Sequence, residues 1–237
     1  MQQRFPRYYP MFHIIDAIDA KDEASAKIVK RYDNPDPHDK RRPLTTGEKC
    51  CSISHLLALQ HFLNSGSERC IIIEDDIIGS DSDFDKVTSF LKLENPAGLT
   101  ILGGQEGLIN SRYLIGTQKS NYLWKLSKMA RRFLLRTCCY SVDIKTAKLI
   151  LSSQLTYLSR ADNWSRILPI NTNFSYIGKF KHPLESNESN LEPERKEENL
   201  FKRAYRDGPT KIATNNSLKM IIFIITRLGI RKKLIEE

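Results

Sequence analysis

Three consecutive carboxylates follow an apolar run, and they offer the clearest chemistry in this sequence. Residues 70–73 are apolar, and Glu74, Asp75 and Asp76 follow them directly. Side chains alternate along an extended chain, so Glu74 and Asp76 are expected to face one way and Asp75 the other. Two hard oxygen ligands on one side suit a Mg²⁺ or Mn²⁺ ion that also holds phosphate oxygens. The pattern predicts a metal site at Glu74 and Asp76, while a helix cap or a solvated loop is the alternative interpretation.

Helices that alternate with short apolar strands are expected to position this acidic segment. Residues 47–66 carry apolar side chains at helical spacing and end in Asn-Ser-Gly, which predicts a helix. We also expect helices at 83–93 and 144–155, and strands at 12–20, 70–74, 99–105, 137–143 and 174–180. This order predicts an α/β fold with a mostly parallel central sheet flanked by helices, in which 70–74 is a central strand. Ligands of such sheets bind beyond the carboxyl ends of the strands, where residues 74–76 lie.

The size and charge of the chain narrow the classes of partner. Its 237 residues predict one sizeable domain, which we place at 1–192, and a charged segment with a basic and apolar C-terminal helix at 193–237. The net charge of +9 favours a phosphorylated substrate, an anionic lipid surface or nucleic acid, and a generally basic surface is the alternative. The sequence has no helix-turn-helix, zinc-finger or aromatic RNA-binding pattern, which argues against nucleic acid.

The cysteines and the apolar runs indicate a cytoplasmic protein. The five cysteines include two adjacent pairs, Cys50–Cys51 and Cys138–Cys139, and no CxxC spacing occurs. This pattern predicts reduced thiols and argues against a disulfide framework or a zinc site. The N-terminus lacks the apolar core of a signal peptide, and no run reaches the roughly 18 apolar residues of a membrane span.

Two basic segments are expected to contact an anionic membrane surface. Residues 121–136 and 217–235 interleave apolar with basic side chains, as membrane-surface helices do. The alternatives are an ordinary amphipathic helix at 121–136 and a helix docked on the domain at 217–230. The membrane interpretation predicts a peripheral location at the cytoplasmic face of the inner membrane.

The segment from Gly47 to His55, together with the acidic segment, resembles glycosyltransferase family 25. This family includes bacterial lipopolysaccharide β-galactosyltransferases and their relatives among collagen galactosyltransferases. Its pattern is a Gly-rich GxxGCxxSH segment that opens a helix, followed by a strand that ends in Glu-Asp-Asp. Here Gly47, Cys51, Ser54 and His55 match the first part, and residues 74–76 match the second. Looser matches are FHIIDAIDA, CCYSVDIKTAKLIL, ADNW and HPLESNESNLE, so the resemblance covers most of residues 12–192.

The resemblance implies a GT-A-like, Rossmann-like fold and an inverting transfer from a nucleotide sugar. UDP-galactose is the favoured donor, and a lipopolysaccharide or lipooligosaccharide is the expected acceptor. Mn²⁺ or Mg²⁺ at Glu74 and Asp76 would act as the Lewis acid on the leaving diphosphate. The donor site is expected to include Gly47, Ser54, His55 and Asp75.

An inverting transfer also needs a base for the acceptor hydroxyl. The resemblance of the ADNW segment makes Asp162 the candidate. An N-cap for the turn that follows is an equal alternative for Asp162, because aspartate is favoured at that position.

Two departures from the family pattern favour a second interpretation. The family begins with an additional strand that contributes to the nucleotide site, whereas this chain reaches residues 12–20 almost at once. A missing strand would leave an unpaired sheet edge and a damaged uridine pocket. In addition, Cys50 stands where the family has a glycine. An inactive remnant or binding module of the same fold is therefore the alternative function, and another Mg²⁺-dependent phosphate enzyme is a third.

Overall fold

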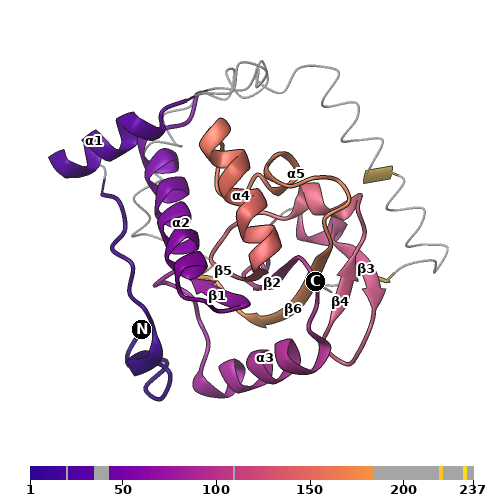
Figure 1. Cartoon of the computed structure of the whole chain (residues 1–237). Coiled ribbons are helices and arrows are strands. Elements are labelled where there is room, and N and C mark those ends of the chain that lie inside the picture. Colours follow the sequence, from indigo (N-terminus) through magenta and orange to yellow (C-terminus); the bar gives the residue numbers. More distant parts are fainter. Residues whose placement is uncertain (20, 35–42, 109, 184–218, 221–231, 234–237) are drawn as a thin grey trace.

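A seven-stranded sheet with the order β1-β5-β2-β6-β4-β3-β7 forms the centre of the molecule (Figure 1). The computed structural model describes residues 1–19, 21–34, 43–108, 110–183, 219–220 and 232–233. The strands are β1 (Arg69–Ile73), β2 (Leu99–Gly103), β3 (Ile115–Gln118), β4 (Trp124–Leu126), β5 (Cys139–Asp143), β6 (Phe174–Phe180) and β7 (Lys232–Lys233). The α-helices are α1 (Glu23–Tyr32), α2 (Thr46–Asn64), α3 (Asp81–Glu94), α4 (Ile144–Thr156) and α5 (Trp164–Ile167). Short 3-10 helices are η1 (Tyr9–Met11), η2 (Ser111–Tyr113) and η3 (Ala130–Phe133).

The α/β class is confirmed, but the prediction of a mostly parallel sheet is wrong. Only β2 and β6 pair in parallel among the described strands, and every other neighbouring pair is antiparallel. The strand β5 inserts between β1 and β2 and runs opposite to both. β1 is therefore an edge strand and not a central one. A strand with both faces covered is apolar throughout in either orientation, so its sequence does not reveal its direction.

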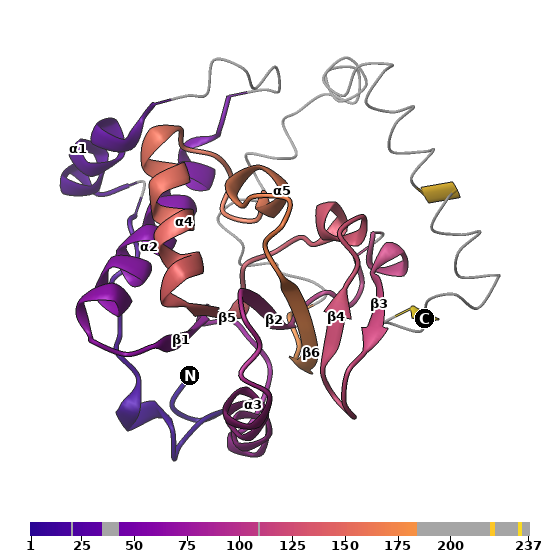
Figure 2. The ribbon, with the colours of Figure 1, turned by 45° about the vertical axis from the view of Figure 1, so that its right-hand side comes forward.

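Two layers of helix cover the two faces of the sheet (Figure 2). The helices α2 and α4 pack together on one face, over Ile101, Tyr140 and Val142. The helix α3 and the N-terminal Phe5 pack on the other face. Side chains alternate between the two faces along β1. Ile72 packs against the core under α2 and α4, while Ile71 and Ile73 pack against the core under α3.

The helix α2 begins and ends at residues that its sequence favours. A capping box joins Thr45 and Glu48 at its N-terminus, which satisfies two backbone N–H groups. It ends beside Ser65, and Gly66 follows at a φ of +75°, where glycine is favoured. The buried Glu48 carboxylate also pairs with Arg160 at 2.8 Å. These features confirm the helix predicted at 47–66.

The structure contradicts two expected elements, the strand at 12–20 and the helix at 121–136. Residues 12–19 form no strand, and Ile14 is exposed. The segment 121–136 is not a helix, because it folds into β4, η3 and loops. Arg131 in this segment is buried and donates to the carbonyl oxygens of Trp164 and Pro169, so it holds α5 in place instead of facing a lipid surface.

The C-terminal region lies mostly outside the described residues. Of residues 193–237, only 219–220 and the strand β7 are described, and β7 pairs with β3. The predicted charged segment and most of the predicted C-terminal helix fall in the remainder. Within the described ranges, every helix is too short or too polar to cross a bilayer.

Asp143 links three elements and gives the first testable prediction. Its two carboxylate oxygens accept from the backbone N–H groups of Thr146 and Gly98, at 2.7 and 2.6 Å. Burial alone would raise the pKa of Asp143, but these hydrogen bonds and Arg69 hold it below its usual range. Replacing Asp143 with Asn removes one acceptor and should lower the free energy of unfolding by about 1–2 kcal/mol at pH 7.

This loss depends on pH in a defined direction. A carboxylate with a lowered pKa stabilises the fold above its unfolded pKa, which is about 3.9, and the contribution disappears as the pH falls through the folded value. The difference between wild type and Asp143→Asn in urea titrations should therefore shrink below about pH 4. Asp16→Asn, which changes an exposed carboxylate, is the control. A difference that stays constant down to about pH 3 would contradict the assignment.

Candidate functional site

Four strand ends meet at one edge of the sheet, and the acidic segment lies among them. Because β5 is antiparallel to β1 and β2, its beginning lies beside their ends, and Ile73 pairs with Cys139. The end of β6 reaches the same edge, where Gly103 pairs with Phe180. The Glu74 N–H donates to the carbonyl oxygen of Cys138 at 2.8 Å, which extends the ladder by one residue. The acids therefore lie directly after the carboxyl end of a strand, as predicted, although that strand is not a central one.

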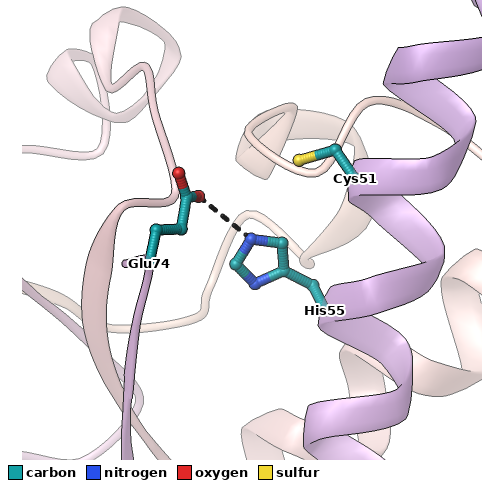
Figure 3. A group of neighbouring side chains, drawn as sticks. All are labelled: Cys51, His55 and Glu74. Atoms are coloured by element: carbon teal, nitrogen blue, oxygen red, sulfur yellow. Dashed lines mark hydrogen bonds and ion pairs between the residues drawn. The ribbon is translucent and has the colours of Figure 1, made fainter. Parts of the chain in front are cut away.

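Glu74 is held by His55 of α2 (Figure 3) and by Thr137, which lies two residues before β5. Its Oε1 lies 3.1 Å from Nε2 of His55 and accepts from the Thr137 hydroxyl at 2.7 Å. The other ring nitrogen of His55, Nδ1, lies 3.2 Å from the Tyr140 hydroxyl. The ion pair therefore has a second polar partner on each side, which compensates for the burial of both charges.

His55 and Glu74 each stabilise the charged form of the other. Burial lowers the pKa of His55, but interactions with Cys51 and Glu74 outweigh it and raise that pKa to about 10. Burial likewise raises the pKa of Glu74, while His55 and Thr137 bring it below its usual value. Both groups are therefore charged at neutral pH.

Asp76 faces a different partner, at the end of β6. Ile78 and Lys181 form a two-way backbone bridge, which brings the residues after β1 beside His182. Asp76 Oδ2 lies 3.0 Å from His182 Nε2, whereas Oδ1 is buried and has no hydrogen-bond partner among the described residues. Burial, together with Glu74 and Asp75, raises the pKa of Asp76 despite the nearby His182.

The chain turns after Ile73, so the simple alternation of side chains ends there. Residues 75 and 76 form a turn, and Asp75 is exposed. The Arg4 guanidinium donates to the backbone carbonyls of Asp75 and Ile77, so the N-terminal segment holds this turn from outside.

The structure places the predicted donor residues on α2 in different environments. Gly47 lies in the first turn of α2. The Ser54 hydroxyl donates to the Cys50 carbonyl at 2.8 Å and accepts from the Ile18 N–H at 2.9 Å, so it joins α2 to the N-terminal segment. His55 alone of these three contacts the acidic segment directly in the described structure.

Asp162 is connected to the site by a hydrogen bond from Arg136, the residue before Thr137. Its Oδ2 accepts from the backbone N–H of Arg136 at 3.2 Å. Arg136 adopts a φ of +62°, which is uncommon for a residue with a side chain, and its guanidinium donates to the Gly104 carbonyl at 2.9 Å. The alternative N-cap role is wrong, because α5 has Asn163 as its N-cap residue.

The arrangement suits a hard divalent cation between Glu74 and Asp76. His55 and Thr137 both contact Oε1 of Glu74, which leaves its Oε2 without a hydrogen bond among the described residues. The orphaned Oδ1 of Asp76 is a second oxygen whose burial a cation would compensate. Glu106 also has a buried oxygen, Oε2, without a partner in the described structure.

Sequence reasoning missed three residues that complete the site. Thr137 precedes the predicted strand, and His182 begins the HPLESNESNLE segment, but neither had a signal of its own role. Cys51 matches the family segment but has no predicted role in the site, whereas the structure brings its sulfur to His55 and Glu74. All five cysteines are free thiols, which confirms the prediction of reduced cysteines.

Comparisons with known proteins identify the family of this chain. A family model described as glycosyltransferase family 25, lipopolysaccharide biosynthesis protein, matches residues 1–154. The chain belongs to glycosyltransferase family 25, and the resemblance of the sequence is confirmed. No curated protein matches the chain. A solved structure of mannose-1-phosphate geranyltransferase from Thermus thermophilus is 14% identical, with a TM-score of 0.34. That alignment covers 55% of this chain and 50% of the other, and it carries no argument about function.

The His55–Glu74 pair predicts how stability changes with pH. A histidine whose pKa rises on folding stabilises the protein fully below its unfolded pKa, about 6.5, and this contribution is lost as the pH rises toward 10. In the wild type, the free energy of unfolding should therefore fall by up to about 1.4 kcal/mol per pH unit between about pH 7 and 9. His55→Gln should abolish this fall. Urea titrations across this range measure the slope.

The control for this prediction is His61→Gln, which changes an exposed histidine on the same helix. It should leave the slope as in wild type. If His55→Gln and His61→Gln gave the same slope, the strong coupling between His55 and Glu74 would be refuted.

Proposed function

We propose that this protein is an inverting, metal-dependent hexosyltransferase with a GT-A-like site. It moves a hexose, with galactose favoured, from a UDP-sugar to a lipopolysaccharide or lipooligosaccharide acceptor. Membership of glycosyltransferase family 25 supports the transfer of a sugar. The observation that carries the metal dependence is the buried Oδ1 of Asp76, which has no hydrogen-bond partner in the described part of the chain and lies at the same end of the strands as Glu74.

Glu74 and Asp76 are the residues that would hold Mn²⁺ or Mg²⁺. When bound, such a cation supplies positive charge that neutralises the leaving diphosphate. His55 and Thr137 fix one oxygen of Glu74, and His182 fixes Oδ2 of Asp76. These contacts hold the two remaining oxygens ready for the metal, which reduces the reorganisation that binding requires.

The other predicted residues take supporting roles in this proposal. Asp162 is the base that accepts the proton of the attacking hydroxyl, and its hydrogen bond from the Arg136 N–H orients the carboxylate. Asp75 is exposed on the turn, where it can contact the donor. Gly47, Ser54 and His55 place the first turns of α2 beside the donor site.

A peripheral place at the cytoplasmic face of the inner membrane fits this function. The acceptor of such a transfer is carried on a lipid. Among the basic residues of 121–136, Lys125, Lys128 and Arg132 are exposed and available to an anionic surface.

One observation favours the alternative of an inactive binding module. In the described structure β1 pairs only with β5, so its outer edge carries no strand. This open edge leaves the acidic segment without a covering strand on that side within the described ranges, and an exposed edge of this kind can pair with another chain. Calorimetric titration of the protein with UDP in the presence of Mn²⁺ separates the two functions, because the inactive remnant should release no heat.

Asp76→Asn gives the sharpest test of the proposed function. The substitution keeps the size of the side chain but removes its charge, so Mn²⁺-dependent UDP binding should be lost. Sugar turnover should fall about 100-fold or more, because a metal contributes several kcal/mol to transition-state stabilisation. Glu94→Gln, at an exposed position at the end of α3, is the control and should behave as wild type.

Circular dichroism of both variants checks that the fold is retained. Turnover that Asp76→Asn leaves intact would exclude Asp76 as a metal ligand. A wild type that binds no UDP even with Mn²⁺ present would instead point to the inactive remnant or binding module.

A further inference from the structure

A sulfur, a nitrogen and an oxygen converge beside the proposed catalytic cation. Cys51, His55 and Glu74 each offer one ligand atom, and these atoms all lie within 4.8 Å of one another. Cys51 and His55 stand one turn apart on α2, which places them on the same face of the helix. Figure 3 shows the Cys51 sulfur pointing toward the space beside the His55–Glu74 pair. We propose that these three residues form a site for a thiophilic divalent cation, of which Zn²⁺ is the representative.

The spacing of the three atoms suits tetrahedral zinc. Zinc bonds of about 2.0 Å to nitrogen and oxygen place those two ligand atoms about 3.3 Å apart. Nε2 of His55 and Oε1 of Glu74 already lie 3.1 Å apart. The Cys51 sulfur lies within 4.8 Å of both atoms, so it is the ligand that would have to move closer to reach the zinc–sulfur distance of about 2.3 Å. Three protein ligands leave a fourth position for water or another ligand.

The ligands already have the supporting contacts that metal sites require. Nδ1 of His55 faces the Tyr140 hydroxyl, so Nε2 is the nitrogen that would bind the metal, and binding would release the Nε2 proton and the Cys51 thiol proton to solvent. Thr137 donates to Glu74 and fixes its carboxylate. A hydrogen bond at the far nitrogen of a ligating histidine and a hydrogen bond to a ligating carboxylate are both typical of zinc sites, and they set the orientation of the ring and the carboxylate.

The same geometry argues against a nucleophilic cysteine. A Cys-His-acid relay needs the thiol and the acid on opposite ring nitrogens, so that the proton passes through the imidazole. Here the acid faces Nε2, and Tyr140 occupies Nδ1. The cluster is therefore arranged for coordination and not for proton relay.

A thiophilic ion would compete with the catalytic cation for Glu74. Thiolate and imidazole select zinc, whereas Glu74 with Asp76 offers only the oxygen ligands that suit Mg²⁺ or Mn²⁺. Because both sites use Glu74, zinc bound through Oε1 would place a second positive charge beside the cation at Oε2 and so weaken the binding of that cation. Zinc should thus inhibit the enzyme by this route. The inhibition rests on the proposed function, whereas the zinc site itself does not.

The test uses Co²⁺ as a coloured substitute for zinc in the full-length, reduced and chelator-treated protein. A thiolate-to-cobalt charge-transfer band should appear in the near ultraviolet with one equivalent bound, and added Zn²⁺ should remove it. Cys51→Ser should abolish the band, while Cys70→Ser, at a cysteine outside the cluster, should retain it. Thr137→Val should weaken Co²⁺ binding about 10–100-fold, because it removes a supporting hydrogen bond.

A second measurement needs no variant. Zn²⁺ should protect Cys51 of the wild-type protein from alkylation by iodoacetamide, as peptide mass spectrometry detects. Absence of the band in wild type, a band that survives Cys51→Ser, or alkylation of Cys51 that Zn²⁺ does not slow would each overturn the site. Failure of the proposed function would look different, because Mn²⁺ would then promote no UDP binding while the cobalt band remained.

Discussion

The buried ion pair between His55 and Glu74 is the constraint on which the rest of the site depends. It joins the middle of α2 to the end of β1, so it fixes where a helix meets the edge of the sheet. Breaking a buried pair by removing one partner typically costs about 3–5 kcal/mol, because the other charge is left without compensation. Tyr140 and Thr137 supply the additional hydrogen bonds that make the pair tolerable. The same pair brings Cys51 to the acidic segment, since the sulfur lies one helical turn away.

The direction of β5 decides which residues can join this pair. Because β5 runs against its neighbours, its first residues stand beside the last residues of β1 and β2. Thr137 and Cys138 therefore reach Glu74. If β5 were parallel to β1, these two residues would lie at the opposite end of the strands. The parallel pairing of β2 with β6 brings His182 to the same edge. The antiparallel β5 and the parallel β6 together bring residues next to three strands, β1, β5 and β6, to the site.

The pKa values of two neighbouring carboxylates, Glu74 and Asp76, shift in opposite directions. Cationic and hydroxyl partners lower the pKa of Glu74, whereas burial raises the pKa of Asp76 and leaves one of its oxygens unpartnered among the described residues. Neighbouring carboxylates with pKa values shifted in opposite directions are typical of functional sites, where each group carries out a different part of the chemistry. A fold that keeps a half-buried carboxylate unsatisfied bears a cost in stability, and a bound cation would remove it.

The sequence by itself determined the helix at 47–66, the buried strands and the carboxylates at a strand end, because local periodicity and capping residues are read along the chain. It also indicated the family through the Gly47–His55 and Glu-Asp-Asp segments. Tertiary structure alone decided the antiparallel sheet, the edge position of β1 and the partnership of Cys51, Thr137 and His182 with the acids. The reason is physical: periodicity reports which faces are buried, but strand direction and contacts between distant residues depend on how loops close in three dimensions.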